Sequence, residues 1–168
     1  KIDTLVVDKT GTLTMGKPQL VSLFADKNDK KELLRIAASL EQASEHPLAH
    51  AILEGAKKEK ISPENIDAFE SITGKGVRGK LNQHTIALGN KTFMSDLQIA
   101  TDQLDARTAE LQNQGETVIY VSMDQKCIGI IGIADPIKET TLEALDALRR
   151  ERMKIVMLTG DHARTAHA

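Results

Sequence analysis

The sequence predicts an α/β domain that is interrupted by an inserted α+β domain. Two short apolar segments rich in β-branched residues, 2–7 and 154–158, stand near the two ends of the chain and are typical of buried parallel strands. Between them, two helical segments are followed by short strand segments broken by glycine, which favours an antiparallel sheet. We therefore expect residues 1–18 and 134–168 to form the α/β domain and residues 19–133 to form the insert.

The first part of the chain predicts two strands followed by two helices. The apolar run 2–7 ends at Asp8, which places this aspartate at the carboxyl end of a strand, where open α/β sheets have their ligand sites. A second strand is expected over 20–25, and a helix over 33–43, where leucine and isoleucine recur at helical spacing. Another helix begins at Pro47, a favourable residue for a first turn.

The middle of the chain predicts hairpins and one helix. The segment 69–89 consists of short strand-like pieces separated by glycine and asparagine, a pattern typical of antiparallel hairpins. A helix is expected over 101–114, because Gly115 is a residue that commonly ends one. Two further strands are expected over 117–123 and 126–134.

The last part returns to alternating helix and strand. Residues 139–150 predict a helix with Leu142, Leu145 and Leu148 on its inward face, followed by the strand 154–158. The first residues already lie in a strand pattern and the last eight resemble the start of a helix. We expect the chain to be part of a longer protein.

Composition narrows the class of protein. The formal net charge is −2 and the only aromatic residues are three phenylalanines and one tyrosine, which disfavours a basic groove or a stacking platform for nucleic acid. No apolar run approaches the roughly 20 residues that span a bilayer. The single cysteine, Cys127, cannot form an internal disulfide and fits a reducing compartment.

The segment from Asp8 to Thr14, DKTGTLT, carries the strongest chemical signal. An aspartate at a strand end, followed by a loop of glycine and hydroxyl residues, can act as a nucleophile whose phosphorylated form is held by backbone N–H groups and a cation. This segment resembles the phosphorylation motif of P-type ATPases. The resemblance implies a haloacid-dehalogenase-like (Rossmann-like) phosphorylation domain, with Asp8 as the phosphorylated nucleophile and with Asp8 and Thr10 as Mg²⁺ ligands.

The residue two places after the nucleophile separates pumps from phosphatases. Phosphatases with the haloacid-dehalogenase-like fold have a second aspartate there, which serves as general acid and base. This chain has Thr10, whose hydroxyl cannot serve as that base near neutral pH. An aspartyl-phosphate at Asp8 is therefore expected to persist, which disfavours a phosphatase and favours a pump that couples chemistry to a conformational step.

Two later segments also resemble segments of P-type ATPases. Thr159, Gly160 and Asp161 follow the strand 154–158, as the TGD motif of these ATPases follows its strand, and the resemblance places them near the phosphate and Mg²⁺. Asp135 and its neighbour Pro136 resemble the hinge segment before the next helix, although an Asp-Pro pair is also a common turn.

The insert resembles the nucleotide-binding domain of the heavy-metal-transporting (type IB) branch. The segment SEHPL, residues 44–48, is similar to the one whose histidine contacts ATP in that branch. Glycines permit a close approach of backbone to a nucleotide, and Glu41 can accept a hydrogen bond from the adenine amino group. The residues that match the pocket of that branch are Glu41, His46, Gly74, Gly76, Gly89 and Asn90.

The resemblance covers essentially the whole chain and implies the use of ATP and Mg²⁺. It also implies that the chain continues into transmembrane and actuator domains, that it lies at the cytoplasmic face of a membrane, and that the transported metal binds elsewhere. A GDGxNDxP segment that supplies further Mg²⁺ ligands in this family is absent from the sequence. We therefore expect this chain to bind nucleotide but to be phosphorylated poorly or not at all.

The transported cation is suggested by resemblance alone. SEHPL, together with the ADPIKE segment at 134–139, is more similar to copper(I) exporters than to zinc and cadmium exporters. Zinc or cadmium export remains the alternative, as does a haloacid-dehalogenase-like phosphatase.

Overall fold

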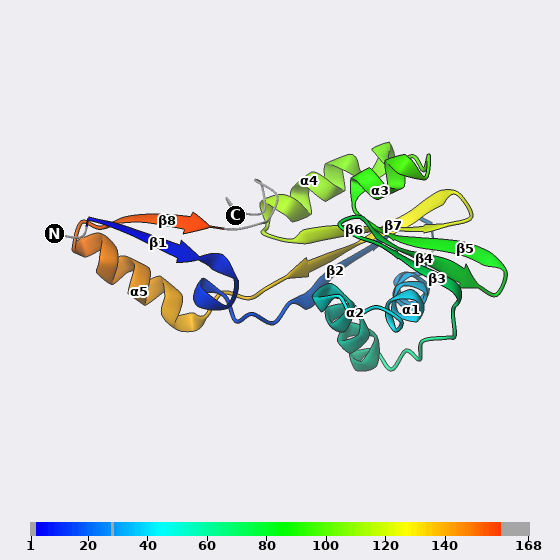
Figure 1. The fold of residues 1–168 in the computed structure, drawn as a ribbon, viewed down its shortest axis with the longest axis horizontal. Helices are drawn as coiled ribbons and strands as arrows, with labels where there is room; N and C mark the ends of the chain where they lie inside the picture. Colours follow the sequence, from blue (N-terminus) through cyan, green and yellow to red (C-terminus); the bar gives the residue numbers. More distant parts are fainter. Residues whose placement is uncertain (1–2, 28, 159–168) are drawn as a thin grey trace.

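The computed structural model describes residues 3–27 and 29–158. Its ribbon has two parts that are joined by two neighbouring segments (Figure 1). The smaller part contains β1 (Thr4–Asp8), the helical turn Lys9–Leu13, α5 (Glu139–Arg150) and β8 (Lys154–Leu158), and the larger part contains the other α-helices and a second sheet. Among the described residues, no helix combines the length and the apolarity that crossing a membrane requires.

The smaller part is a pair of parallel strands with a helix against it. β1 and β8 pair in register, so that Asp8 lies opposite Leu158. The prediction that Leu142 faces inward is wrong, because this side chain is 65% exposed. The inward face of α5 includes Thr141, which is 7% exposed. Because neighbouring residues of an α-helix point about 100° apart, Leu142 points away from that face. Leu145 and Leu148 are half-buried.

The larger part is a six-stranded antiparallel sheet with helices on both faces. Its strand order is β2-β7-β6-β5-β4-β3. In Figure 1, α1 and α2 cover one face and α3 and α4 the other. The strands are β2 (Gln19–Ala25), β3 (Asp67–Ile72), β4 (Gly76–Leu81), β5 (His84–Gly89), β6 (Thr117–Met123) and β7 (Lys126–Ala134). The helices are α1 (Lys30–Glu41), α2 (Pro47–Lys58), α3 (Lys91–Asp96) and α4 (Asp105–Asn113).

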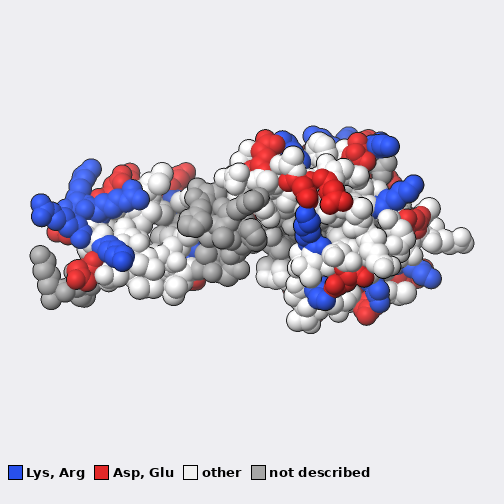
Figure 2. Space-filling view, turned by 90° about the horizontal axis from the view of Figure 1, so that it is seen from above, with Lys and Arg blue, Asp and Glu red and all other residues white. Residues whose placement is uncertain are grey.

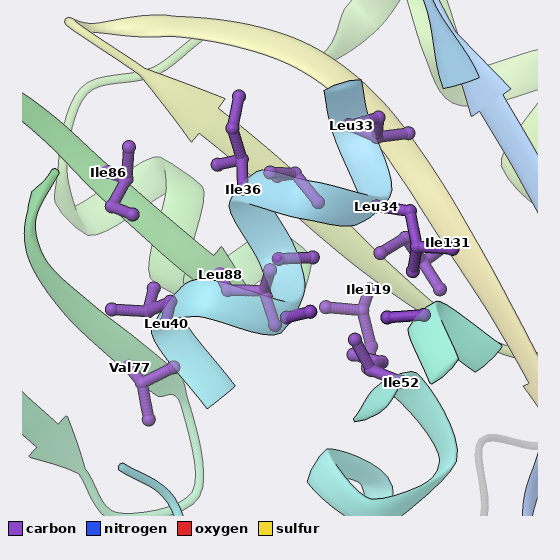
Figure 3. Close-up of a cluster of buried hydrophobic side chains, with 14 of the residues drawn as sticks. Leu33, Leu34, Ile36, Leu40, Ile52, Val77, Ile86, Leu88, Ile119 and Ile131 are labelled. Atoms are coloured by element: carbon purple, nitrogen blue, oxygen red, sulfur yellow. The ribbon is translucent and has the colours of Figure 1, made fainter. Parts of the chain in front are cut away.

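Alternation along β6 divides the core between the two faces of the sheet. Ile119 and Val121 belong to the cluster that α1 and α2 complete, whereas Val118 and Tyr120 belong to the cluster under α3 and α4. Figure 3 shows the first cluster, in which Leu34 of α1 is fully buried. Because β6 is buried on both sides, its sequence is a continuous apolar run rather than an alternation.

The predicted elements that fall within the described residues are confirmed with two differences, and the helix start expected over the last eight residues lies outside them. α3 was not predicted, because a helix of six residues is too short to show clear periodicity. The helix expected over 101–114 is divided into a 3₁₀ turn, Asp102–Leu104, and α4.

Acidic and basic side chains are intermixed on the face of the larger part that Figure 2 shows.

Candidate functional site

Asp8 is the last residue of β1 and its side chain is exposed. The chain then enters a single irregular helical turn, Lys9–Leu13, in which Gly11 has φ of +78°. Only glycine adopts this backbone conformation without a steric penalty, which explains why the turn has a glycine here. The exposed carboxylate of Asp8 and the exposed side chain of Thr10 therefore stand at the start of a tight loop.

A hydrogen-bond network centred on Asp135 fixes this loop. The hydroxyl of Thr14 accepts from Gly11 N–H at 3.1 Å and donates to Asp135 Oδ2 at 2.5 Å. The same carboxylate accepts from the backbone N–H of Gly16, at 3.2 Å, and of Lys17, at 3.0 Å. Asp135 thus binds the segment that leads out of the loop, a role that the sequence alone left open between a hinge and a simple turn.

Lys138 and Thr141 attach the start of α5 to the same loop. Lys138 Nζ donates to the carbonyl oxygen of Gly11 at 2.7 Å, and the Thr141 hydroxyl donates to that of Leu13 at 2.7 Å. Lys138 N–H also donates to Leu13 O at 3.0 Å. The carbonyl groups of Gly11 and Leu13 are therefore satisfied by the start of α5, which fixes that helix to the loop that follows Asp8.

The expected second half of the phosphorylation site lies outside the described residues. Thr159, Gly160 and Asp161 follow β8 in the sequence but are not among them. Within residues 3–27 and 29–158, no group of three or more His, Cys, Asp or Glu side chains could hold a metal ion. Asp8 and Thr10 offer oxygen ligands, the kind that Mg²⁺ prefers.

A cavity of about 730 Å³ lies in the larger part, within the size range of small-molecule sites. It is lined by the end of α1, the start of α2, the turn between β3 and β4, and parts of β5 and β6. All six residues of the pocket predicted from the sequence line this one cavity: Glu41, His46, Gly74, Gly76, Gly89 and Asn90. Sequence reasoning missed Phe69, which also lines it, and gave no role to Lys75, the residue between Gly74 and Gly76, which lines it as well.

Glu41 brings a buried carboxyl group to the cavity. The residue is 5% exposed, and its Oε2 has no hydrogen-bond partner among the described residues. Burial raises the pKa of Glu41 above its usual value, and a hydrogen bond with Ser44 opposes part of that rise. An unpaired buried acceptor is unfavourable, so a ligand that donates a hydrogen bond here removes a penalty.

His46 is the N-cap of α2. Its Nδ1 accepts from Leu48 N–H at 3.2 Å, and Pro47 occupies the first position of the helix. A neutral imidazole that accepts at Nδ1 carries its hydrogen on Nε2. The cap thus orients the exposed ring and leaves Nε2–H as a donor at the edge of the cavity.

The glycines serve strand packing as well as the cavity. Gly76 and Gly89 lie opposite each other in β4 and β5. A Cβ at Gly76 would lie 2.1 Å from the carbonyl oxygen of Leu88, and one at Gly89 would lie 2.4 Å from that of Lys75. Close approach of two backbones therefore requires both glycines, whether or not a ligand is present.

Asn90 ties the turn between β3 and β4 to α3. Its Nδ2 donates to the carbonyl oxygen of Gly74 at 2.9 Å, and its Oδ1 accepts from Phe93 N–H at 2.9 Å as the N-cap of α3. Gly74 has φ of +72° and a Cβ there would meet no atom within 4 Å. One side chain thus holds the glycine-containing turn at the cavity edge.

Comparison with known proteins gives a family and a set of relatives. The profile of the haloacid dehalogenase-like hydrolase family matches residues 2–168. The chain is 46% identical over its whole length to a copper-transporting P-type ATPase of Rhizobium leguminosarum bv. viciae and 42% identical to a copper-exporting P-type ATPase of Legionella pneumophila. A silver exporting P-type ATPase of Salmonella typhimurium is 41% identical. The chain spans 20%, 23% and 20% of these relatives, respectively.

Solved structures give the same architecture. A zinc-transporting PIB-type ATPase in an E2.Pi state matches 99% of the chain with a TM-score of 0.79 and 29% identity, and the match covers 27% of that protein. The catalytic domain of the CPx-ATPase CopB-B, in a study of nucleotide binding, matches 96% of the chain with a TM-score of 0.69 and 30% identity. That match covers 55% of the CopB-B chain.

Proposed function

The chain belongs to the haloacid dehalogenase-like hydrolase family, and we propose that within it the chain is the nucleotide-binding and phosphorylation region of a P-type ATPase that exports Cu(I). The observation that carries this proposal is the convergence of Glu41, His46, Gly74, Gly76, Gly89 and Asn90 on one cavity. These residues come from several separate elements of the chain, so their convergence is not a consequence of local sequence.

The larger part, residues 19–133, is proposed to bind ATP. The buried Oε2 of Glu41 accepts from the adenine amino group, and Nε2–H of His46 donates to an acceptor of the nucleotide. Apolar side chains such as Ile72 and Val77 contact the base. The cavity volume of about 730 Å³ is large enough for a nucleotide to be mostly enclosed.

The smaller part, residues 1–18 and 134–168, is proposed to accept the phosphoryl group. A carboxylate oxygen of Asp8 attacks the γ-phosphorus, and the bond from that phosphorus to the β,γ-bridging oxygen breaks, so that ADP leaves and an aspartyl-phosphate remains. Mg²⁺ would be held by Asp8 and Thr10 and would neutralise charge on the phosphoryl oxygens. Thr159, Gly160 and Asp161 are proposed to lie near the same phosphate.

Cu(I) is proposed as the cargo because curated relatives at 41–46% identity are named as copper or silver transporters. The parent protein would span a membrane, with this region at its cytoplasmic face and the cargo bound elsewhere. Zinc or cadmium is the alternative, since a zinc-transporting ATPase shares the fold at 29% identity. Phosphoenzyme formation by the longer protein with Cu(I), Ag(I), Zn²⁺ or Cd²⁺ distinguishes the two.

The test is the replacement of His46 by Gln, with ATP binding measured by calorimetry. We expect affinity to fall about threefold to tenfold, the effect of one lost hydrogen bond. His50→Gln is the matched control, because His50 lies on the same helix and is exposed but does not line the cavity. Unchanged affinity in His46→Gln, or an equal loss in both variants, would show that the nucleotide pocket has been placed wrongly.

A further inference from the structure

Lys75 has a fixed backbone at the edge of the cavity. It lies in the turn between β3 and β4, where its N–H donates to Ile72 O at 3.0 Å and its carbonyl oxygen accepts from Asn90 N–H at 3.0 Å. Its side chain is 42% exposed, and Nζ lies 2.5 Å from Asp96 Oδ2. The position of the Cα atom is therefore set by the sheet, whereas the ammonium group is held only by one partly exposed carboxylate.

Charge distinguishes Lys75 from the rest of the cavity. Among the described residues that line it, Lys75 is the single lysine or arginine, and the lining also contains the two carboxyl groups of Glu41 and Glu45. A nucleotide brings negatively charged phosphates, for which a flexible ammonium group is a common partner. Lys75 is thus the residue of this lining whose charge suits the phosphates.

Asp96 holds that ammonium group from outside the cavity. It is the last residue of α3 and does not line the cavity. A carboxylate at the C-terminal end of a helix interacts unfavourably with the helix dipole, and the favourable electrostatic partner that the structure gives Asp96 is the Lys75 ammonium group. The same helix begins with Lys91, a cation at the end where the helix dipole disfavours positive charge. Lys91 pairs with Asp105 at 2.6 Å. Neither member of that second pair lines the cavity.

We propose that Lys75 contacts the phosphate groups of the bound nucleotide and that Asp96 competes with those phosphates for the Lys75 ammonium group. This inference rests on the proposed nucleotide site. It adds a residue that determines how much more tightly the site binds ATP than adenosine. Because both members of the Lys75–Asp96 pair are partly exposed, at 42% and 46%, exchange of one anion for another is inexpensive. Asp96 therefore lowers affinity for ATP but not for adenosine.

The test compares ATP with adenosine, each titrated calorimetrically into the whole chain. Asp96→Asn removes the competing charge and should tighten ATP about twofold to fivefold, the size expected for a partly exposed ion pair. Lys75→Gln should weaken ATP about threefold to tenfold, and Lys75→Arg should retain most of the affinity. Adenosine affinity should change in none of these variants. Asp96→Asn should have no effect when combined with Lys75→Gln.

Lys91→Gln and Asp105→Asn are the matched controls, because they break an ion pair of similar length and exposure away from the cavity. They should leave both affinities unchanged. Equal changes for ATP and adenosine, or an effect of Asp96→Asn that survives in the Lys75→Gln background, would overturn the inference. If the unmodified chain bound neither ligand, the nucleotide site itself would be refuted. Urea midpoints of each variant show whether it is folded.

Discussion

The Thr14 hydroxyl donates to Asp135 Oδ2 at 2.5 Å and joins residues that lie 121 positions apart in the sequence. The contact connects the two segments that run between the smaller and larger parts. Met15 N–H donates to Pro136 O at 2.8 Å beside it, and Thr14 forms an isolated antiparallel bridge with Ile137. The two connections are therefore paired with each other, and the start of α5 is fixed to the loop that follows Asp8.

Replacement of Asp135 by Ala is expected to loosen the connection between the two parts. The carboxylate accepts hydrogen bonds from Gly16 N–H and Lys17 N–H, so these two amides should exchange with solvent about tenfold faster, which corresponds to roughly 1.4 kcal/mol. Amide exchange followed by NMR measures the effect. Amides of β6 serve as an internal control, and unchanged exchange at Gly16 and Lys17 would show that Asp135 does not hold this segment.

Replacement of Gly76 by Ala is expected to destabilise the larger part by about 1–3 kcal/mol, because the new Cβ would collide with Leu88 O and displace β4 from β5. Urea unfolding without nucleotide measures the change. Gly74→Asn is the control, since asparagine tolerates a positive φ and a Cβ at this position meets no neighbouring atom within 4 Å. A Gly76→Ala variant as stable as the unmodified chain would mean that this glycine serves only the ligand.

Replacement of Glu41 by Gln is expected to make stability less dependent on pH. Burial raises the pKa of Glu41 in the folded state, so the folded protein retains this proton to higher pH than the unfolded chain does. The stabilising contribution is complete below the unfolded value of about 4.3 and is lost as pH rises through the folded pKa. The glutamine amide of the variant does not titrate, so it removes this dependence.

The free energy of unfolding is measured with urea between pH 4 and pH 8 for the Glu41→Gln variant and the unmodified chain. The variant should gain stability relative to the unmodified chain as pH rises, by about 1–3 kcal/mol at pH 8. Glu45→Gln, a change at an exposed position on the same cavity, is measured beside it as the control for removing one carboxyl group from the cavity lining. A constant difference between the Glu41→Gln variant and the unmodified chain across this range would contradict a raised pKa.

Much of the fold could be predicted because its elements carry local signals. Apolar runs predicted β6, β7 and β8 with the bounds that the structure has. The start of α2 was predicted from Pro47, and the placement of Asp8 at a strand end from the run that precedes it. These features depend on neighbours within a few residues, so one sequence is enough to reveal them.

The orientation of Leu142 could not be predicted from local sequence. A leucine every third residue indicated one face of α5, but the helix packs with Thr141 inward and leaves Leu142 65% exposed. Periodicity gives the apolar stripe only approximately, whereas the sheet and the loop that the helix meets decide its rotation. Thr141 donates to Leu13 O, a contact between residues 128 positions apart that no local pattern records.

The sequence by itself determined most of the elements, the loop chemistry around Asp8 and six of the residues that line one cavity. The tertiary structure alone decided that Asp135 holds the outgoing segment, that Gly76 and Gly89 face each other, and that Asp96 pairs with Lys75. The physical reason is that periodicity and motif reflect interactions along the chain. The partners of a side chain depend on strand order and helix rotation, which are set by packing between residues far apart in sequence.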